Sequence, residues 1–301
     1  MPRVANRIIS NQARGLIRGG NPNAGLKRGM SAVIVLFQQG DRIKAKQELS
    51  ILEGYLTAGG YLDHVANAYD MLEQLCNEVE SQKEADIARS KAFNFREQSA
   101  SNKGIDNLVQ FYTSQGLDGS LVELLSKDRT SIMEEKALEE RQKGESELFE
   151  KVWNAYYLAG NYLSKKHPGI AGQLRWTMGM MAEKLNDNKT ALWFYENAMP
   201  LLKKDKEINH EIYDYQLKAG LTAIEARDQK KAEKLLCDWL ENLKNKEGKY
   251  SARERAKELA YSLVDKYGPD VEGRYASVIN NVLKPILPEH IRIPLFDSPS
   301  R

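Results

Sequence analysis

The sequence predicts an all-α fold of antiparallel helical hairpins stacked as an array, and three observations support this class. No proline occurs in the 145 residues between Pro22 and Pro168, and proline is the residue that breaks helices most strongly. The apolar/polar alternation that is typical of strands is scarce. Apolar residues instead recur three or four positions apart, the spacing of one helix face. The clearest sets are Leu49, Leu52 and Leu56, and, after Gly59-Gly60, Val65, Tyr69 and Leu72.

The composition is that of a folded protein. The 301 residues are 42% hydrophobic and 29% charged, and 44 basic residues against 42 acidic ones give a net charge of +2. A disordered chain would have fewer apolar residues and a larger net charge. No apolar run reaches the roughly 18 residues that a membrane-spanning helix needs, so we expect no transmembrane segment.

The basic charge is concentrated at the start of the chain. Residues 1–40 contain six basic residues and no acidic one, whereas the remaining 38 basic and 42 acidic residues carry a net charge of −4. The six are Arg3, Arg7, Arg14, Arg18, Lys27 and Arg28. We expect an irregular basic arm over residues 1–27, with its arginines on one stripe at helical spacing before Gly19-Gly20 and Pro22 break it.

Four interpretations of this arm are open. It is Arg-rich and poor in acids, as organelle-targeting presequences are. Its cations would also suit phosphate contacts with a nucleic acid or an anionic membrane surface. The fourth interpretation is a basic tail that docks on the mildly acidic body or on a neighbouring subunit.

Two helical regions and a connector should follow the arm. The N-terminal helical subdomain, residues 28–98, should contain helices over 28–39, 41–57, 60–81 and 83–97. The connector, residues 99–144, should contain a polar break at 99–104, short helices over 105–115 and 119–127, and a charged helix over 129–143. The C-terminal helical-repeat domain, residues 145–283, should contain helices over 145–165, 169–185, 188–203, 208–226, 229–244, 251–267 and 270–283.

The last stretch, residues 284–301, differs from the rest because it holds four of the nine prolines. Proline alternates there with apolar residues, so we expect an extended tail and no helix. The exposed apolar side chains must pack on this body or on a partner. The expected anchors are Ile286, Leu287, Ile293, Leu295 and Phe296.

A pattern of small and large residues repeats after 41 residues within residues 172–244. The first copy is Met178-Gly179, Ala182, Ala191, Tyr195 and Ala198, and the second is Ala219-Gly220, Ala223, Ala232, Leu236 and Trp239. Small residues on one helix let the next helix approach, and large ones fill the space beside them. The pattern resembles the tetratricopeptide repeat, with a weaker match over residues 46–77. It departs from that family in its period, which is about 34 residues there, and in the missing proline after the second helix.

The resemblance implies where a partner would bind. In a tetratricopeptide array the first helix of each hairpin lines a concave groove, which would place Trp176, Met180, Leu217 and Leu221 in it. An apolar groove with an aromatic residue suits a peptide or a helix. The alternative is that these four residues are ordinary core residues.

We find no catalytic or metal-binding motif in the sequence. A phosphate-binding glycine loop, a dinucleotide fingerprint, a nucleophile elbow and a His-Glu-x-x-His helix are all missing. Cys76, Cys237 and the four histidines have no zinc-site spacing. We therefore expect no enzyme, no metal and no cofactor, although a site assembled from distant residues stays an alternative.

The expected function is that of a structural or protein-interaction subunit of a larger assembly, an organelle complex or a virion. Other protein subunits would dock on the helical body and on both ends of the chain. The alternative is an adaptor that binds nucleic acid or an anionic membrane through residues 1–28. Sparse cysteines favour a reducing, intracellular location; the Arg-rich start would suit the mitochondrial matrix or a membrane-associated complex, and a virion interior stays open.

Overall fold

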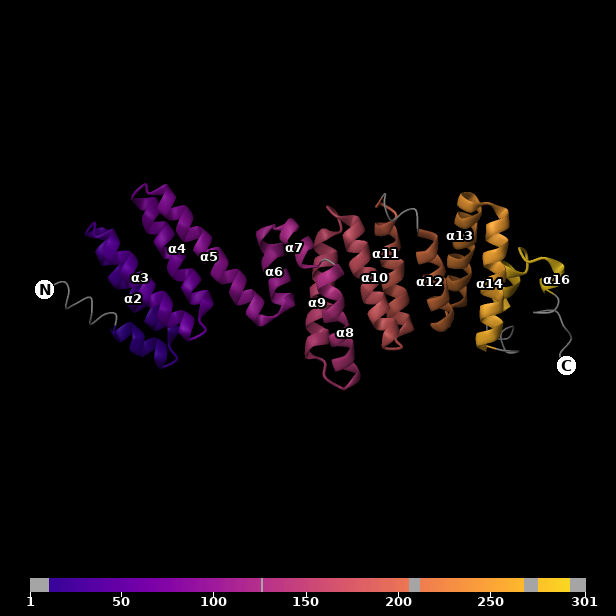
Figure 1. Cartoon of the computed structure of the whole chain (residues 1–301), viewed down its shortest axis with the longest axis horizontal. Coiled ribbons are helices and arrows are strands. Elements are labelled where there is room, and N and C mark those ends of the chain that lie inside the picture. Colours follow the sequence, from indigo (N-terminus) through magenta and orange to yellow (C-terminus); the bar gives the residue numbers. More distant parts are fainter. Residues whose placement is uncertain (1–10, 126, 206–211, 268–275, 293–301) are drawn as a thin grey trace. The chain divides into compact units, whose positions relative to one another are not determined.

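The computed structural model describes residues 11–125, 127–205, 212–267 and 276–292. These residues form helices and contain no strand, so the predicted all-α class is confirmed for the described part of the chain. The chain forms two compact units, residues 1–111 and 112–301. Figure 1 shows successive helices lying against one another within each unit.

The first unit is built from paired helices in chain order. A helix over residues 11–18 is followed by α2 (Pro22–Gln38), α3 (Arg42–Ala58), α4 (Leu62–Glu78), α5 (Gln82–Lys103) and the first part of α6 (Ile105–Gln115). Helix α2 packs on α3 and α4, and α4 packs closely on α5. Leu52, Leu56, Val65 and Tyr69 lie in the core between them, as the apolar spacing predicts.

One turn conformation recurs every twenty residues in this unit. Gly20, Gly40 and Gly60 have φ angles of 78°, 77° and 77°, and Glu80 has a φ of 55°. At each position the amide of the following residue donates to a carbonyl five residues before it, as Asp41 N does to Leu36 O at 3.0 Å. This is the Schellman helix stop, in which one left-handed residue reverses the chain. The period makes α2, α3 and α4 equal in length, at 17 residues each.

The second unit continues the pattern of adjacent helices. Its helices are α7 (Asp118–Leu124), α8 (Lys127–Gln142), α9 (Glu147–Leu163), α10 (Pro168–Lys184), α11 (Asn188–Leu202), α12 (Ile212–Glu225), α13 (Gln229–Glu247), α14 (Lys249–Tyr267), a π-helical turn η3 (Ile279–Leu283) and α16 (Glu289–Arg292). From α8 to α14 each helix packs on the next one in the chain. The stacking is compatible with a helical repeat.

The 41-residue pattern corresponds to a repeated contact between helices. A Cβ atom added to Gly179 would lie 2.4 Å from Tyr195 Cε1, and one added to Gly220 would lie 2.6 Å from Leu236 Cδ2. Both distances are shorter than real Cβ contacts, so each large side chain fills the space that the glycine leaves open. The same small–large pair therefore sets the approach of α10 to α11 and of α12 to α13.

The expected irregular arm is wrong for its described part. Residues 11–18 are helical and α2 begins at Pro22, inside the range given to the arm. Ala13 and Ile17 lie four residues apart and are each 2% exposed. Ile17 packs so closely on α2 that a Cβ atom on Gly25 would lie 2.4 Å from it. Burial of one apolar face thus holds this short helix against the body.

Two further expectations are corrected. The polar stretch at 99–104 does not break the helix, because α5 continues to Lys103 and stops at Gly104, whose φ is 131°. Residues 284–292 are not extended. The amides of Ile286 and Leu287 donate to Leu283 O, and Pro288 O accepts the first hydrogen bonds of α16. Proline is tolerated there because the start of a helix needs no N–H partner.

Candidate functional site

A cavity of about 230 Å³ lies between α8, α10 and α12, on the helices that the repeat pattern assigns to one face. Two of the four expected groove residues, Trp176 and Met180, line it. The other lining residues are Leu125, Ser131, Glu134, Ile170, Gln173, Leu174, Thr177 and Tyr215. We call this cavity the α10 groove.

Trp176 forms the rigid part of the α10 groove. It is 9% exposed, stacks on Tyr195 with ring centroids 4.0 Å apart and meets Tyr215 edge-on at 4.6 Å. Offset and edge-on contacts are the favoured aromatic geometries, so the indole is fixed from two sides. Met180 is 39% exposed, and its flexible side chain lies at the surface one turn further along α10.

Leu217 and Leu221 do not line the α10 groove. Both are half-buried and pack against the core of the second unit. Tyr215 lines it instead and was not predicted from the sequence, because the 41-residue correspondence gave its place on α12 to Leu217. Residues two apart on a helix point to nearly opposite sides, so this small offset changes which side chain faces α10.

Polar contacts hold the helices around the α10 groove. Glu183 accepts hydrogen bonds from the Tyr195 hydroxyl and from Thr222 Oγ1, each at 3.1 Å, and pairs with Lys218 Nζ at 2.6 Å. Burial, and then the Glu183 charge, raise the pKa of Tyr195 well above that of a free tyrosine. Tyr195 therefore stays a neutral donor at physiological pH and acts as a structural tie between α10 and α11.

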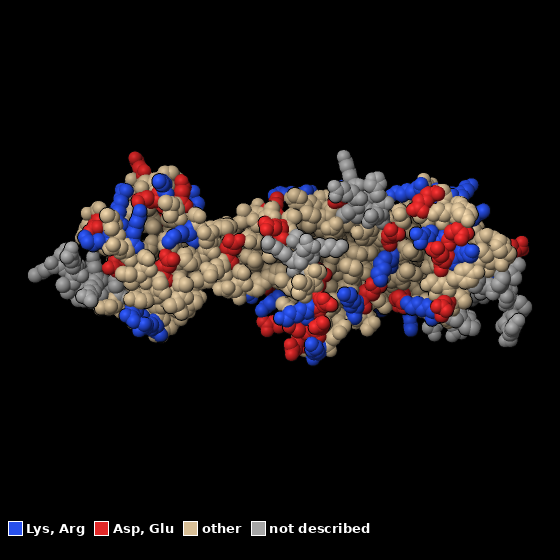
Figure 2. Space-filling view, in the orientation of Figure 1, with Lys and Arg blue, Asp and Glu red and all other residues tan. Residues whose placement is uncertain are grey.

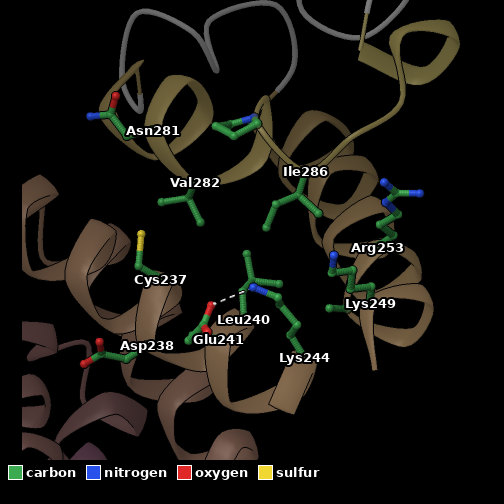
Figure 3. Close-up of a pocket in the computed structure, with 12 residues that line it drawn as sticks. Cys237, Asp238, Leu240, Glu241, Lys244, Lys249, Arg253, Asn281, Val282 and Ile286 are labelled. Carbon is green, nitrogen blue, oxygen red and sulfur yellow. Dashed lines mark hydrogen bonds and ion pairs between the residues drawn. The ribbon is translucent and has the colours of Figure 1, made fainter. Parts of the chain in front are cut away.

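A larger cavity, of about 550 Å³, lies between α13, α14, η3 and the residues that follow η3 (Figure 3). Leu240, Ala252 and Val282 are buried and form its apolar floor. Figure 3 shows Cys237 and Asp238 on one side and Lys249 and Arg253 on the other. This cavity was not predicted from the sequence, because its residues come from three segments and carry no motif. We call it the α13–α14 cavity.

The Cys237 thiol is free and exposed at the edge of the α13–α14 cavity. Burial of the sulfur and the nearby carboxylates of Glu233 and Asp238 raise its pKa. The thiol is therefore mostly protonated at neutral pH and is a weak nucleophile. Nothing in this arrangement favours catalysis by Cys237.

The described part of the basic arm contacts the first unit. The Arg14 guanidinium lies 5.4 Å from the centre of the Tyr55 ring, and Arg28 donates two hydrogen bonds to Gln12 Oε1, at 2.9 and 2.7 Å. Arg18 and Lys27 are exposed. Arg3 and Arg7 lie outside the described residues.

Two of the five expected tail anchors lie among the described residues. Leu287 is 5% exposed and Ile286 is half-buried, and both pack with the core of the second unit. Ile293, Leu295 and Phe296 lie outside the described residues.

The surface charges are mixed on the face that Figure 2 shows. Many described cations pair with acids on a neighbouring helix, such as Lys46 with Glu84 at 2.5 Å and Arg89 with Glu73 at 2.7 Å. Exposed pairs of this kind contribute little to stability, about 0–1 kcal/mol each.

Neither a metal centre nor a membrane span is found within the described ranges. The residues there contain no group of three or more His, Cys, Asp or Glu side chains placed to hold a metal ion. None of the described helices is both long enough and apolar enough to cross a membrane.

Comparison of the sequence with known families and curated proteins finds no match. The sequence matches no family model, and no curated protein shows significant similarity to it.

Proposed function

We propose that this chain is a noncatalytic structural and protein-interaction subunit of a larger assembly, such as an organelle complex or a virion. The observation that carries this proposal is the α10 groove, in which Trp176, Met180 and Tyr215 from two hairpins line a hollow whose wall is mostly apolar. Aromatic residues and methionine are enriched where proteins bind one another.

The α10 groove suits an apolar side chain presented by a helix or an extended peptide. Trp176 is already fixed by Tyr195 and Tyr215, so a partner would bind it without ordering it first. Met180 can adapt its shape to the partner. The groove lies on the first helix of each hairpin, as it would in a tetratricopeptide-like array, and we extend the resemblance to this chain as part of the proposal.

The ends of the chain would add contacts to the same assembly. Arg18 and Lys27 are exposed within a stretch of forty residues that contains no acid. Such an unbalanced charge attracts acidic surfaces on neighbouring subunits.

The proposal predicts that Met180→Glu removes the chain from its assembly. A carboxylate at the edge of the α10 groove would have to be buried against an apolar partner, which is costly without a counter-charge. Native size measurement in extract of the source should show the wild type in a large complex and Met180→Glu shifted toward the free chain.

Leu158→Glu is the matched control. Leu158 is 43% exposed, close to the 39% of Met180, but it lies on α9 and does not line the α10 groove. We expect this variant to stay in the complex. A wild-type chain that migrates as a free monomer in native extract would contradict the proposal.

A second candidate function is an adaptor that binds nucleic acid or an anionic membrane through residues 1–28. The exposed Arg18 and Lys27 favour it. Binding to duplex DNA would then weaken with a log–log salt slope of about −0.9 per phosphate contact. Binding that is unchanged when all six basic residues of this segment become Ala would exclude it. These are Arg3, Arg7, Arg14, Arg18, Lys27 and Arg28.

A further inference from the structure

Three exposed cations at the start of the described chain have no acidic partner. Residues 11–40 contain four basic residues and no acidic one. Three of the four are exposed: Arg18, Lys27 and Arg28. None of these three forms an ion pair within the described part of the chain. Their positive charge is therefore available to an anionic partner.

Four acids of the neighbouring helices α3 and α4 are engaged elsewhere. Each of them pairs with a cation on α5, on the side of the unit away from the first helix in the chain order. The pairs are Glu53 with Lys91, Asp63 with Lys103, Asp70 with Arg96 and Glu73 with Arg89. These carboxylates already have a counter-charge, so they do not offset the three exposed cations.

The three cations gather near one contact because the helix over residues 11–18 packs on the start of α2. A Cβ atom on Gly25 would lie 2.4 Å from Ile17. Arg18 directly follows Ile17, and Lys27 and Arg28 lie two and three positions after Gly25. A helix rises about 1.5 Å per residue, so the three residues lie within about one turn of this contact. We call Arg18, Lys27 and Arg28 the arm surface.

Amide side chains accompany the arm surface. Arg28 donates hydrogen bonds from Nε and Nη2 to Gln12 Oε1, at 2.9 and 2.7 Å. This contact orients the guanidinium and leaves its Nη1 donors for an anion. Asn11 and Asn23 are exposed as well. Arginine, lysine and amide side chains are the groups that contact phosphates in complexes with nucleic acids.

The same helix offers no apolar face to a membrane. Its apolar residues Ala13 and Ile17 are each 2% exposed, because they face the body. The exposed residues are polar or small: Asn11, Gln12, Gly15 and Arg18. A helix that lies in a membrane interface needs a large exposed apolar face. The arm surface therefore suits a charged partner in water better than a lipid surface.

Aromatic rings for stacking bases are missing from this part of the chain. Phe37 is the single aromatic residue of residues 11–40, and it is buried at 6% exposure. Proteins that bind single strands stack the bases on exposed aromatic side chains. A duplex presents its phosphates outward and needs no such platform, so cations and amides suit a duplex.

We propose that the arm surface binds the phosphate backbone of a double-stranded nucleic acid. The proposal rests on the second candidate function, which it narrows to one class of partner and to three named residues. It does not depend on the α10 groove.

The salt dependence of binding to a fluorescently labelled DNA duplex tests the proposal with the full chain. Arg18→Ala with Lys27→Ala and Arg28→Ala removes three phosphate contacts, so the log–log salt slope should become less negative by about 2.7. Between about 50 and 200 mM salt, the affinity of the wild type should then fall about 40-fold more than that of the variant. Fluorescence anisotropy measures both affinities.

The matched control removes the same charge from the second unit. Lys230, Lys249 and Arg253 are exposed on α13 and α14. Changing these three to Ala should leave the salt slope at its wild-type value. Arg18→Lys with Arg28→Lys, which keeps the charge, should also keep the slope, because lysine contacts phosphates as well.

Three outcomes overturn the proposal. The first is an equal slope in the wild type and in the triple Ala variant of the arm surface. If binding is nevertheless lost when all six basic residues of residues 1–28 become Ala, the second candidate function stands without the arm surface. The second is an equal loss of slope in the control variant, which would show that only net charge matters.

The third outcome separates the classes of partner. Dependence on the arm surface that is seen with phosphatidylserine vesicles or with polyglutamate, and with neither a DNA nor an RNA duplex, would assign the surface to a membrane or to an acidic protein. Dependence seen with a duplex supports the proposal. The duplex with the steeper salt slope, DNA or RNA, then identifies the source of the phosphates.

Discussion

Single glycines set how closely the helices of the second unit approach one another. Gly179 and Gly220 each face a large side chain on the next helix, at distances that leave no room for a Cβ atom. Gly160 is also buried in a helix, but the atoms nearest to its Cβ position lie at 3.8 Å, which is an ordinary contact.

These distances predict opposite effects of the same substitution. Gly179→Ala and Gly220→Ala should each destabilise the second unit by about 1–3 kcal/mol, because the added methyl group overpacks the interface. Gly160→Ala, the matched control, should be neutral or stabilise by up to about 1 kcal/mol through the better helix propensity of alanine. Denaturant unfolding of the three variants measures the differences. Equal effects at all three sites would contradict the packing argument.

Tyrosine hydroxyls also act as interhelical ties at the residue scale. Tyr156 donates to Glu134 at 2.5 Å and Tyr162 donates to Asp118 at 2.7 Å. The Asp118 pKa lies below its usual range because Lys166, and then Tyr162, donate hydrogen bonds to its carboxylate. These contacts orient α8 and α7 relative to α9 without burying an unpaired charge.

At the scale of elements, a residue at positive φ follows many of the described helices, among them α2, α3, α4, α10 and α12, and reverses the chain there. Three of these positions hold residues other than glycine: Glu80 with φ 55°, Asn186 with φ 61° and Arg227 with φ 60°. A side chain at positive φ costs about 1–2 kcal/mol unless the residue is glycine or a short polar one such as asparagine. These turns form despite this cost because the packing of the helices on both sides of each turn offsets it.

Arg227→Gly and Glu80→Gly should therefore stabilise the protein by about 0.5–1 kcal/mol. Glycine relieves the strain of the left-handed conformation, but part of this gain is lost because glycine gives up more backbone entropy on folding. Gly60→Ala, at φ 77°, should destabilise the protein by a similar amount. This reverse substitution is the control, because it places a side chain at a left-handed position instead of removing one. Thermal unfolding monitored by circular dichroism gives the shifts. Destabilisation by Arg227→Gly would show that its side chain has a role beyond the turn.

At the scale of the whole molecule, buried apolar residues of the described ranges gather in two hydrophobic clusters. One joins Ile17 through Ala92, and the other joins Trp176 through Ile291. The division falls inside α6, between Phe111 and Tyr112. Independent cores usually unfold as separate cooperative units.

Calorimetry should therefore show two unfolding transitions. Gly54→Ala, in α3 with open space at its Cβ position, should raise only the transition of the first unit. Gly179→Ala should lower only that of the second. A single transition that both variants shift would mean that the units unfold together.

The sequence predicted the helices well because their signals are local. Apolar spacing and proline placed most elements within a few residues of their observed bounds, and the 41-residue pattern paired Gly179 with Tyr195, which do lie in contact. The arginines of the arm were recognised at helical spacing, but the arm was expected to be irregular. The buried Ala13 and Ile17 and the close packing of Ile17 on α2 are what hold residues 11–18 as a helix on the body.

The sequence by itself determined the all-α class, the stacking of successive helices and the small–large pairs, since each depends on residues close together in the chain or on a fixed period. Only the tertiary structure decided which side chains share a cavity. Tyr215 joins Trp176, and Lys249 joins Cys237 and Ile286, because neighbouring helices bring them together from distant positions. No spacing in the sequence encodes the rotation of one helix against the next, and that rotation selects the residues of a site.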